Sequence, residues 1–269
     1  MKKITIIGGG NLGSAIASGI LNTGFILPEQ LKVTKRNVST LDHLAEKGVQ
    51  ISNNNQEAVD WADVIFLCIK PYHAAELLEQ LRFRPNQLVV STISGLSISD
   101  IRKYLLKDIF LCRAMPNTAI AVRQSMTCIC FDTIDPQYSA FVYDLFDNLG
   151  NVIMIDESLM DAATVLGACG TAFAMRYIRA NIQAGIQIGF NSKQAFSIVA
   201  QTVKGAAELL MILDAHPERE IDKVTTPKGC TIMGLNEMEH QGFSSSIIKG
   251  LVASFDKLRH ISPEKQQKD

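Results

Sequence analysis

Six residues near the N-terminus constrain the fold of this 269-residue chain more than any other feature. The segment Gly8-Gly9-Gly10-Asn11-Leu12-Gly13 follows a short β-branched run, Ile4 to Ile7, and opens a stretch with small and apolar residues at helical spacing. This arrangement predicts a strand, a glycine turn and a helix. The first glycine allows the tight turn, the second lets a pyrophosphate approach, and the third lets the helix pack on the strand. The motif predicts a dinucleotide site, with a purely structural glycine turn as the alternative.

Strand and helix patterns alternate through the first half of the chain, which is typical of parallel βαβ units. The expected strands are 4–7, 31–34, 64–69, 88–94, 109–114, 126–131 and 152–155, and the expected helices are 11–23, 40–47, 73–81, 97–106 and 137–149. From about residue 158 helical periodicity replaces the Val and Ile runs. We therefore expect an α/β fold, with a Rossmann dinucleotide-binding domain over 1–157 and an all-helical domain over 158–269.

The second half contains long helices with few charges. We expect helices over 158–184, 192–213, 217–223, 231–239 and 244–260, with Ser192 capping the second. A long apolar helix is usually buried on more than one side. The pattern favours burial against a second subunit, and a helical lid on the chain's own first domain is the alternative.

Charge and composition exclude several classes of protein. With 26 basic and 27 acidic side chains, the chain has no long-range field for nucleic acid or an anionic membrane. The longest uncharged stretch of the second half, 162–175, has 14 residues, short of the roughly 18 of a membrane span, and no secretory signal is evident. The six cysteines and five histidines lack metal spacing, and Cys128 and Cys130 are spaced as neighbours on one strand face. We expect a cytoplasmic protein with reduced thiols, no metal and a small-molecule partner.

The turn after the second expected strand bears on the choice of cofactor. An NAD site would place an acid here for the ribose 2′-hydroxyl, but none occurs between Glu29 and Asp42. The turn reads Thr34-Lys35-Arg36-Asn37 instead, and a guanidinium suits a 2′-phosphate. The turn therefore favours NADP(H), and a solvated surface pair of Lys35 and Arg36 is the alternative.

Landmarks along nearly the whole chain resemble the pyrroline-5-carboxylate reductases. The most specific is Val224 to Ile232, VTTPKGCTI, which is similar to the family's V-T-S-P-G-G-T-T-I signature. Others are the glycine motif, the 34–37 turn, Asn55, and the segments 66–71, 113–118 and 201–207. The resemblance implies a Rossmann domain, a helical domain that interlaces in dimers and often builds larger homo-oligomers, and NAD(P)H-dependent reduction of the C=N bond of 1-pyrroline-5-carboxylate to L-proline.

The resemblance also implies roles for individual residues. For the cofactor, they are Gly8, Gly10, Asn11, Leu12 and Gly13 at the pyrophosphate, Lys35, Arg36 and Asn37 at the 2′-phosphate, Asn55 at the ribose or adenine, and Ile69, Lys70, Pro71, Met115 and Asn117 beside the nicotinamide. For the substrate, they are Thr226, Lys228, Gly229, Cys230 and Thr231. Thr231 is the catalytic candidate.

The substrate segment has a physical logic of its own. It opens a helix whose free N–H groups can bind a carboxylate, and the Thr231 hydroxyl can hydrogen-bond the imine nitrogen. Imine reduction requires orientation and a proton-compatible group more than a strong nucleophile. The alternative is that Thr231 is only a helix cap.

Three departures from the family pattern bear on substrate choice. The S-G-S-G-P-A segment of the family is Gly167 to Ala172 here, Ala119 replaces a usual proline, and Lys228 replaces a glycine, so that it either reaches the substrate carboxylate or points into solvent. The leading hypothesis is an NADPH-dependent reductase that makes proline. The alternatives are a related reductase of another cyclic imine or carbonyl acid, and a non-catalytic NADP(H)-binding regulator.

Overall fold

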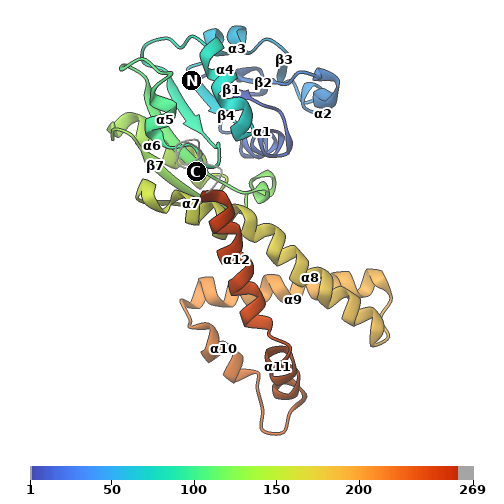
Figure 1. Cartoon of the computed structure of the whole chain (residues 1–269). Helices are drawn as coiled ribbons and strands as arrows, with labels where there is room; N and C mark the ends of the chain where they lie inside the picture. The colour runs from blue at the N-terminus through green and yellow to red at the C-terminus, as the bar shows by residue number, and fades with distance from the viewer. Residues whose placement is uncertain (1, 260–269) are drawn as a thin grey trace. The chain divides into compact units, whose positions relative to one another are not determined.

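The computed structural model describes residues 2–259, and its N-terminal part is built on one sheet (Figure 1). The strands are β1 (Ile4–Ile7), β2 (Leu31–Thr34), β3 (Gln50–Ser52), β4 (Val64–Leu67), β5 (Leu88–Ser91), β6 (Phe110–Met115), β7 (Ser125–Phe131) and β8 (Gly150–Met154), in the order β3-β2-β1-β4-β5-β6-β7-β8. Neighbours from β3 to β6 run parallel, so their carboxyl ends share one edge. The order reverses between β1 and β4, where open α/β sheets bind ligands. The expected α/β class is confirmed.

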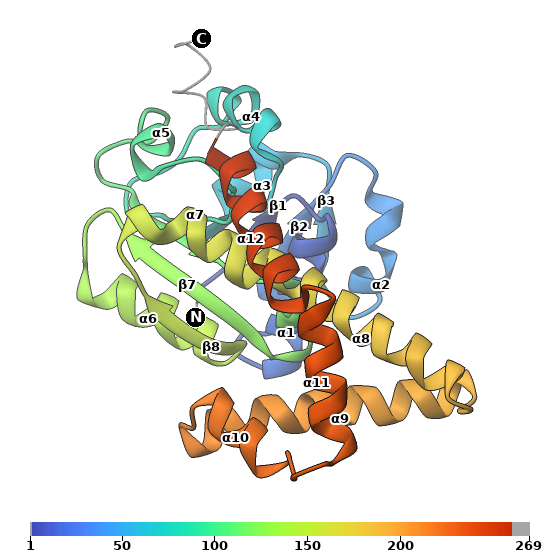
Figure 2. The ribbon, with the colours of Figure 1, turned by 60° about the horizontal axis from the view of Figure 1, so that its bottom comes forward.

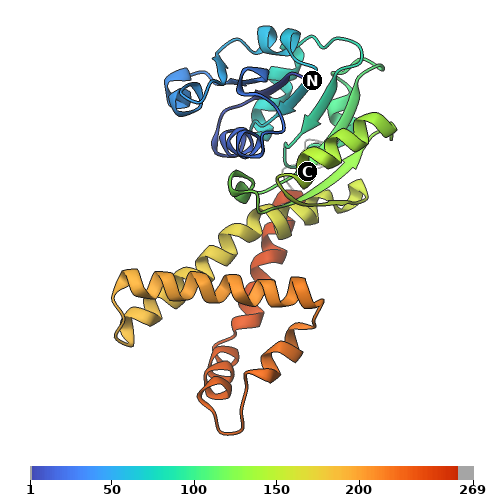
Figure 3. The same cartoon turned by 180° about the vertical axis from the view of Figure 1, so that it is seen from behind.

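Helices cover both faces of this sheet because its central strands are apolar on both sides (Figures 1 and 3). They are α1 (Asn11–Thr23), α2 (Asp42–Ala45), α3 (Asn55–Trp61), α4 (Ala74–Gln80), α5 (Ile98–Arg102) and α6 (Pro136–Asp147). On one face, α1 and α6 enclose a core with Ile6 and Phe66. On the other, α3, α4 and α5 enclose a core with Ile7 and Ile65.

The run of expected parallel βαβ units ends at β7. Strands β6 and β7 pair antiparallel, because the nine residues between them, 116–124, form only the 3-10 helix η4 (Thr118–Val122). Such a connection is too short for the crossover that parallel strands need. The expected helix over 40–47 is also split, into the 3-10 helix η2 (Val38–Leu41) and α2. Strand β3 and helix α3 were not expected, since both are short and largely polar.

A continuous helical stretch from Glu157 to Gln187 follows β8. It passes through η5 (Glu157–Leu159), α7 (Met160–Ala163), a π-helical turn, η6 (Thr164–Cys169), and α8 (Gly170–Gln187). The expected helix over 158–184 is therefore present, but a π-turn interrupts its regular hydrogen bonding. Such turns occur frequently at functional sites.

The remaining helices are α9 (Ser192–Leu213), α10 (Pro217–Lys223), α11 (Cys230–His240) and α12 (Phe243–Arg259). Figure 2 shows the turn that joins α8 to α9. The cap of α9 is Asn191, whose side chain accepts from the backbone N–H of Gln194, so the expectation of Ser192 as the cap is wrong by one residue. For the last expected helix, position 260 lies outside the described residues.

The chain divides into two compact units. The first runs to Thr171 and includes the chain from Ser254 onward, and the second is Ala172–Ala253. Within the second unit, Ile182 and Ala195 are the buried apolar residues among those the structure describes. Large apolar side chains along α8 and α9 are exposed, including Ile186, Ile198 and Ile212. The second unit therefore lacks a substantial core within one chain.

Two helical stretches are long and apolar enough to cross a membrane by length and composition alone. They are Glu157–Gln187 and Ser192–Leu213, with 17% and 0% of the most apolar window buried. The expectation that no segment is long enough to span a membrane is wrong by length and composition. That expectation rested on stretches without any charged residue, whereas a spanning helix tolerates an isolated charge such as Arg176. Composition alone does not separate such helices from helices that a second subunit covers.

Candidate functional site

The predicted cofactor residues of the first unit lie at the carboxyl edge of the parallel strands. The glycine turn follows β1, Lys35 to Asn37 follow β2, Asn55 begins the helix after β3, Ile69 to Pro71 follow β4, and Met115 and Asn117 lie at the end of β6. The fold therefore brings residues that are far apart in sequence to one edge, at the point where strand order reverses.

The glycine turn is shaped by two close approaches. Gly8 has a φ of 105°, and a Cβ atom there would lie 2.4 Å from the carbonyl oxygen of Cys68. At Gly13, a Cβ would lie 2.1 Å from the carbonyl oxygen of Gly8. Both positions require glycine for packing, before any ligand is considered.

Gly10 differs from these two glycines. A Cβ there would meet nothing within 4 Å, and its φ of −79° suits any residue. Gly10 is the N-cap of α1, and no side chain caps the helix there. The first turn of the helix, which includes Asn11 and Leu12, contains no acidic residue. Exposed N–H groups at an open helix N-terminus fit a pyrophosphate. The glycine turn thus has the shape that a dinucleotide cofactor needs.

The turn after β2 carries two cations at this edge. Arg36 is exposed and Lys35 is partly buried, and neither side chain pairs with an acid among the described residues. The Asn37 Oδ1 accepts from the backbone N–H of Ser39 at 3.2 Å and from its hydroxyl at 2.7 Å. Asn37 therefore shapes the turn, and its amide nitrogen is the group left for a phosphate.

Thr34, at the end of β2, connects three parts of the cofactor edge. Its carbonyl oxygen accepts from the N–H groups of Gly8 and Gly9, at 3.2 and 2.7 Å. Its buried hydroxyl donates to Asn55 Oδ1 at 2.6 Å. The Asn55 amide nitrogen is then available to donate to a cofactor oxygen. The sequence analysis did not single out the role of Thr34, which depends on the pairing of β2 with β1.

The two segments expected beside the nicotinamide differ in exposure. Ile69 and Pro71 are partly buried and Lys70 is exposed in the turn after β4. Met115 is only 3% exposed and belongs to the core, so its backbone is the part available to a ligand. Asn117 caps η4, accepting from Ala119 N–H at 3.0 Å, and its amide nitrogen donates to the carbonyl oxygen of Gly167 at 3.3 Å.

That Gly167 carbonyl lies in the segment that departs from the family pattern. Residues 164–169 form the π-turn, and Thr171 Oγ1 also donates to the Gly167 carbonyl, at 3.5 Å. The departures therefore fall where the helix is irregular and hydrogen-bonded to Asn117, a residue expected beside the nicotinamide. We expect them to affect that end of the site rather than the fold.

The segment that is expected to bind the substrate lies in the second unit, at the start of α11. Residues 226–229 form a tight turn, in which Gly229 N–H donates to the Thr226 carbonyl at 3.0 Å. Pro227 followed by a positive φ of 58° at Lys228 identifies a type II turn, whose third residue is usually glycine. Lysine in this left-handed conformation costs about 1 kcal/mol, which explains the glycine in the family pattern. The Lys228 side chain is exposed.

Thr231 does not cap α11. The N-cap is Gly229, which makes no side-chain cap hydrogen bond, and Thr231 is the second residue of the helix, after the exposed Cys230. The capping alternative is therefore wrong, because the helix begins one residue earlier than expected. The half-buried Thr231 hydroxyl has no hydrogen-bond partner among the described residues, and the first turn contains no acid. This arrangement leaves a hydroxyl and free N–H groups for an anionic ligand.

The buried cysteines of the first unit are packed rather than poised for redox or metal chemistry. Cys128 and Cys130 are both buried on β7, and burial raises the pKa of the Cys130 thiol to about 11 and that of Cys68 to about 12. These thiols stay protonated near neutral pH. Within residues 2–259, no group of three or more His, Cys, Asp or Glu side chains could hold a metal ion.

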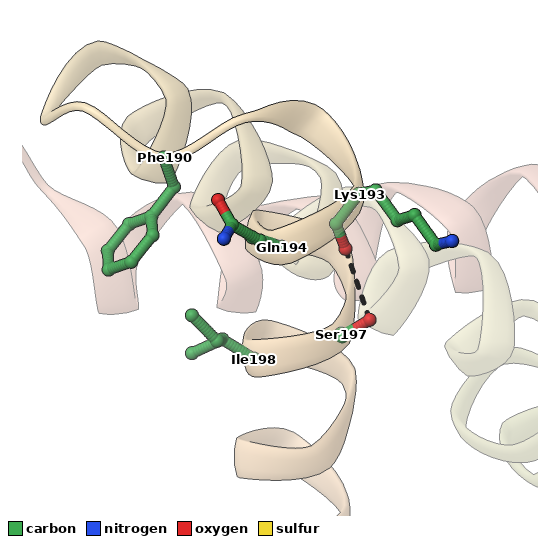
Figure 4. A pocket seen from close by; sticks show the side chains of 5 residues that line it. All are labelled: Phe190, Lys193, Gln194, Ser197 and Ile198. Carbon is green, nitrogen blue, oxygen red and sulfur yellow. Dashed lines mark hydrogen bonds between the residues drawn. The ribbon is translucent and has the colours of Figure 1, made fainter.

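A pocket of about 310 Å³ lies elsewhere in the second unit, beside the turn between α8 and α9 (Figure 4). It is lined by Phe190, Lys193, Gln194, Ser197 and Ile198, and the Ser197 hydroxyl donates to the Lys193 carbonyl at 3.1 Å. None of the predicted site residues lines it. It belongs to the exposed apolar surface of this unit.

Comparisons with known proteins identify the family. Residues 157–261 match the family model for pyrroline-5-carboxylate reductase dimerisation, and residues 3–95 match that for NADP oxidoreductase, coenzyme F420-dependent. Pyrroline-5-carboxylate reductase 2 of Dictyostelium discoideum is 41% identical over 95% of this chain and 92% of its own length. The chain belongs to the pyrroline-5-carboxylate reductase family.

Other pyrroline-5-carboxylate reductases agree with this assignment. Reductase 1 of D. discoideum is 44% identical over 98% of this chain, which spans only 50% of that longer protein. The crystal structure of the Plasmodium falciparum enzyme with NADP bound has a TM-score of 0.88 at 26% identity, covering 97% of this chain and 98% of that one. The Streptococcus pyogenes enzyme has a TM-score of 0.87 at 29% identity, covering 97% and 99%. The family consists of NAD(P)H-dependent oxidoreductases that act on a C=N bond, and this chain carries its dimerisation domain.

Proposed function

We propose that this protein reduces the C=N bond of 1-pyrroline-5-carboxylate with NADPH and forms L-proline. The observation that carries the proposal is the 41% identity over nearly the whole length of a reductase. The geometry supports it, since the glycine turn, the Arg36 turn and the free N-terminus of α11 are all present. NADPH, when bound, supplies the hydride.

The substrate segment supplies orientation and a proton-compatible group. The free N–H groups at the start of α11 hold the substrate carboxylate, because a helix N-terminus favours negative charge. The Thr231 hydroxyl hydrogen-bonds the imine nitrogen and keeps the ring in one orientation. Hydride adds to the ring carbon, the nitrogen takes one proton from solvent, and the same hydroxyl remains the hydrogen-bond partner of the resulting amine. Orientation of this kind requires no nucleophile or carboxylate pair.

The preference for NADPH over NADH rests on Arg36, with Lys35 beside it. Charge-assisted hydrogen bonds contribute about 1.5 to 3 kcal/mol, so Arg36→Ala should weaken NADPH binding about 10- to 100-fold and leave NADH nearly unchanged. Dissociation constants for both cofactors test this. Arg219→Ala, an exposed arginine of the second unit, is a matched control. Equal losses for the two cofactors would contradict the assignment.

The activity is tested by NADPH oxidation with racemic pyrroline-5-carboxylate, with proline measured as product, beside a panel of other cyclic imines. The altered segment 167–172 and Lys228 favour a second candidate, a related reductase of another cyclic imine, because small changes in a pocket shift substrate preference by only a few kcal/mol. Turnover of another imine alone would support that candidate. NADPH binding without turnover of any imine would support the non-catalytic regulator.

We also propose that the protein acts as a homo-oligomer in the cytoplasm, with no membrane or nucleic acid partner. The dimerisation match covers both long apolar helices, so a second subunit accounts for their exposed side chains without a bilayer. The near-neutral charge supports a small-molecule substrate. Cell fractionation with an antibody against the protein tests the location, and recovery in the membrane pellet would contradict it.

A further inference from the structure

The buried side chain of Arg113 on β6 makes an ion pair that the proposed chemistry does not use. Its side chain is 5% exposed, and Nη1 lies 2.9 Å from Oε1 of Glu157, which is 35% exposed. The same carboxylate oxygen accepts from the backbone N–H of Ile98, the first residue of α5, at 2.5 Å. Glu157 begins the continuous helical stretch that contains the π-turn. The ion pair therefore fixes the start of that helix against the sheet and against α5.

A second contact fixes the same helix ten residues later. Asn117, four residues after Arg113, donates to the Gly167 carbonyl within the π-turn. Between the two contacts, Met160 is fully buried and Thr164 is 5% exposed. The segment from Arg113 to Asn117 thus holds the helix at two points. One point is a charged pair, and the other is the residue expected beside the nicotinamide.

We propose that Arg113 and Glu157 are positioning residues for imine reduction. The pair sets where the helix lies along β6, so that the π-turn meets Asn117 and the nicotinamide end of the cofactor edge keeps its shape. The inference rests on the proposed function, because it assigns that edge to the reacting end of the cofactor.

The energetics of the Arg113–Glu157 pair indicate that it positions the helix rather than stabilises the fold. A buried ion pair often contributes little net stability, because both charges lose their hydration. Here Arg113 Nη2 is buried and has no hydrogen-bond partner in the described part of the chain, so the pair is incompletely satisfied. The directional contact of Arg113 Nη1 with Glu157 Oε1, and the hydrogen bond of that same oxygen to Ile98 N–H, define a position more strictly than apolar contacts do.

The double variant Arg113→Met/Glu157→Gln separates positioning from stability. Methionine fills the arginine volume without charge, and glutamine keeps an oxygen acceptor for Ile98 N–H. We expect a melting temperature near that of the wild type, unchanged NADPH affinity, and kcat lower by about 10- to 100-fold, because misplacement by about 1 Å is enough for such a loss. Wild-type kcat in this variant would overturn the proposal.

Glu157→Asp provides a second and gentler test. It keeps both charges but shortens the side chain by one methylene, so it draws the helix toward Arg113. We expect a kcat loss of about 10-fold with the fold intact, and full turnover would overturn the proposal even if the double variant failed to fold.

A second ion pair with a buried cation, Lys32–Glu57, is a matched control. Lys32 is 7% and Glu57 60% exposed, with 3.0 Å between them, and neither belongs to the predicted site. We expect Lys32→Met/Glu57→Gln to keep the wild-type kcat, and an equal loss there would overturn the specific role of Arg113. If wild-type protein shows no imine reduction at all, the proposed function fails. If wild type is active and the Arg113 and Glu157 variants equal it, only this inference fails.

Discussion

The two units of this chain differ in where they can bury their apolar surface. The first encloses both faces of its sheet, with residues such as Phe66, Ile65 and Phe146 fully buried. The second exposes most of the large side chains of α8 and α9 and buries little beyond Ile182 and Ala195. A folded chain rarely leaves such a surface in water. The difference indicates that the first unit carries its core within one chain, whereas the second depends on a second copy.

A charge placed on the second unit should have the largest effect. Ile212 on α9 is 75% exposed in the single chain, and in an oligomer Ile212→Glu would bury an unpaired carboxylate. We expect loss of the oligomer, with the dissociation constant raised at least about 100-fold, measured by light scattering over a dilution series. Ile134→Glu is the matched control, because Ile134 is 65% exposed on the first unit. If both variants assemble normally, the contrast between the units is wrong.

Removal of the Thr231 hydroxyl should affect turnover without affecting folding. Because Gly229 is the cap of α11, Thr231→Ala has no cap to remove. We expect kcat to fall by about 100-fold, with unchanged melting temperature and NADPH affinity, while Thr231→Ser keeps much of the activity. Steady-state kinetics beside thermal unfolding measure both quantities. A lower melting temperature with normal turnover per folded molecule would show that Thr231 has a purely structural role.

The glycine turn offers a pair of variants that separates cofactor binding from packing in the first unit. Gly10→Ala adds a methyl group to open space, so stability should hold while the affinity for both NADPH and NADH falls about 10-fold, since the pyrophosphate approaches there. Gly13→Ala places the same group 2.1 Å from a carbonyl oxygen and should destabilise the fold itself. Calorimetric binding and thermal unfolding distinguish these outcomes. Normal cofactor affinity in Gly10→Ala would favour the structural glycine turn.

Lys228→Gly should have the smallest effect on function of these variants. Glycine relieves the left-handed strain, so we expect a gain of up to about 1 kcal/mol in the free energy of unfolding. If the ammonium also reaches the substrate carboxylate, KM for the substrate rises several-fold while kcat holds. Lys228→Asn is the control, because asparagine tolerates a positive φ without charge. A KM unchanged in both variants would place the lysine in solvent.

Local sequence signals were sufficient to predict those parts of the structure that depend only on residues close together in the chain. The strand from Ile4, the glycine turn and the start of α1 at Asn11 occur as expected, because their glycine and apolar spacing is local. The type II turn at Pro227 and Lys228 has only half of its local signal, because Pro stands at the second position but Lys replaces the glycine that is usual at the third.

Features that depend on tertiary contacts could not be predicted from local sequence signals. The short polar strand β3 gains its identity from pairing with β2. The π-turn is tied to the side chain of Asn117, fifty residues from Gly167, and the burial of Met115 depends on helices that pack over β6. The role of Thr34 similarly appears only once β1 and β2 are paired.

Sedimentation velocity of the wild-type protein, without detergent and at micromolar concentration, tests the contrast between the units most directly. We expect a single species at the mass of a dimer or a larger homo-oligomer, well above the 29.5 kDa of one chain. A stable, monodisperse species at the mass of one chain, with its helices intact by circular dichroism, would contradict the account.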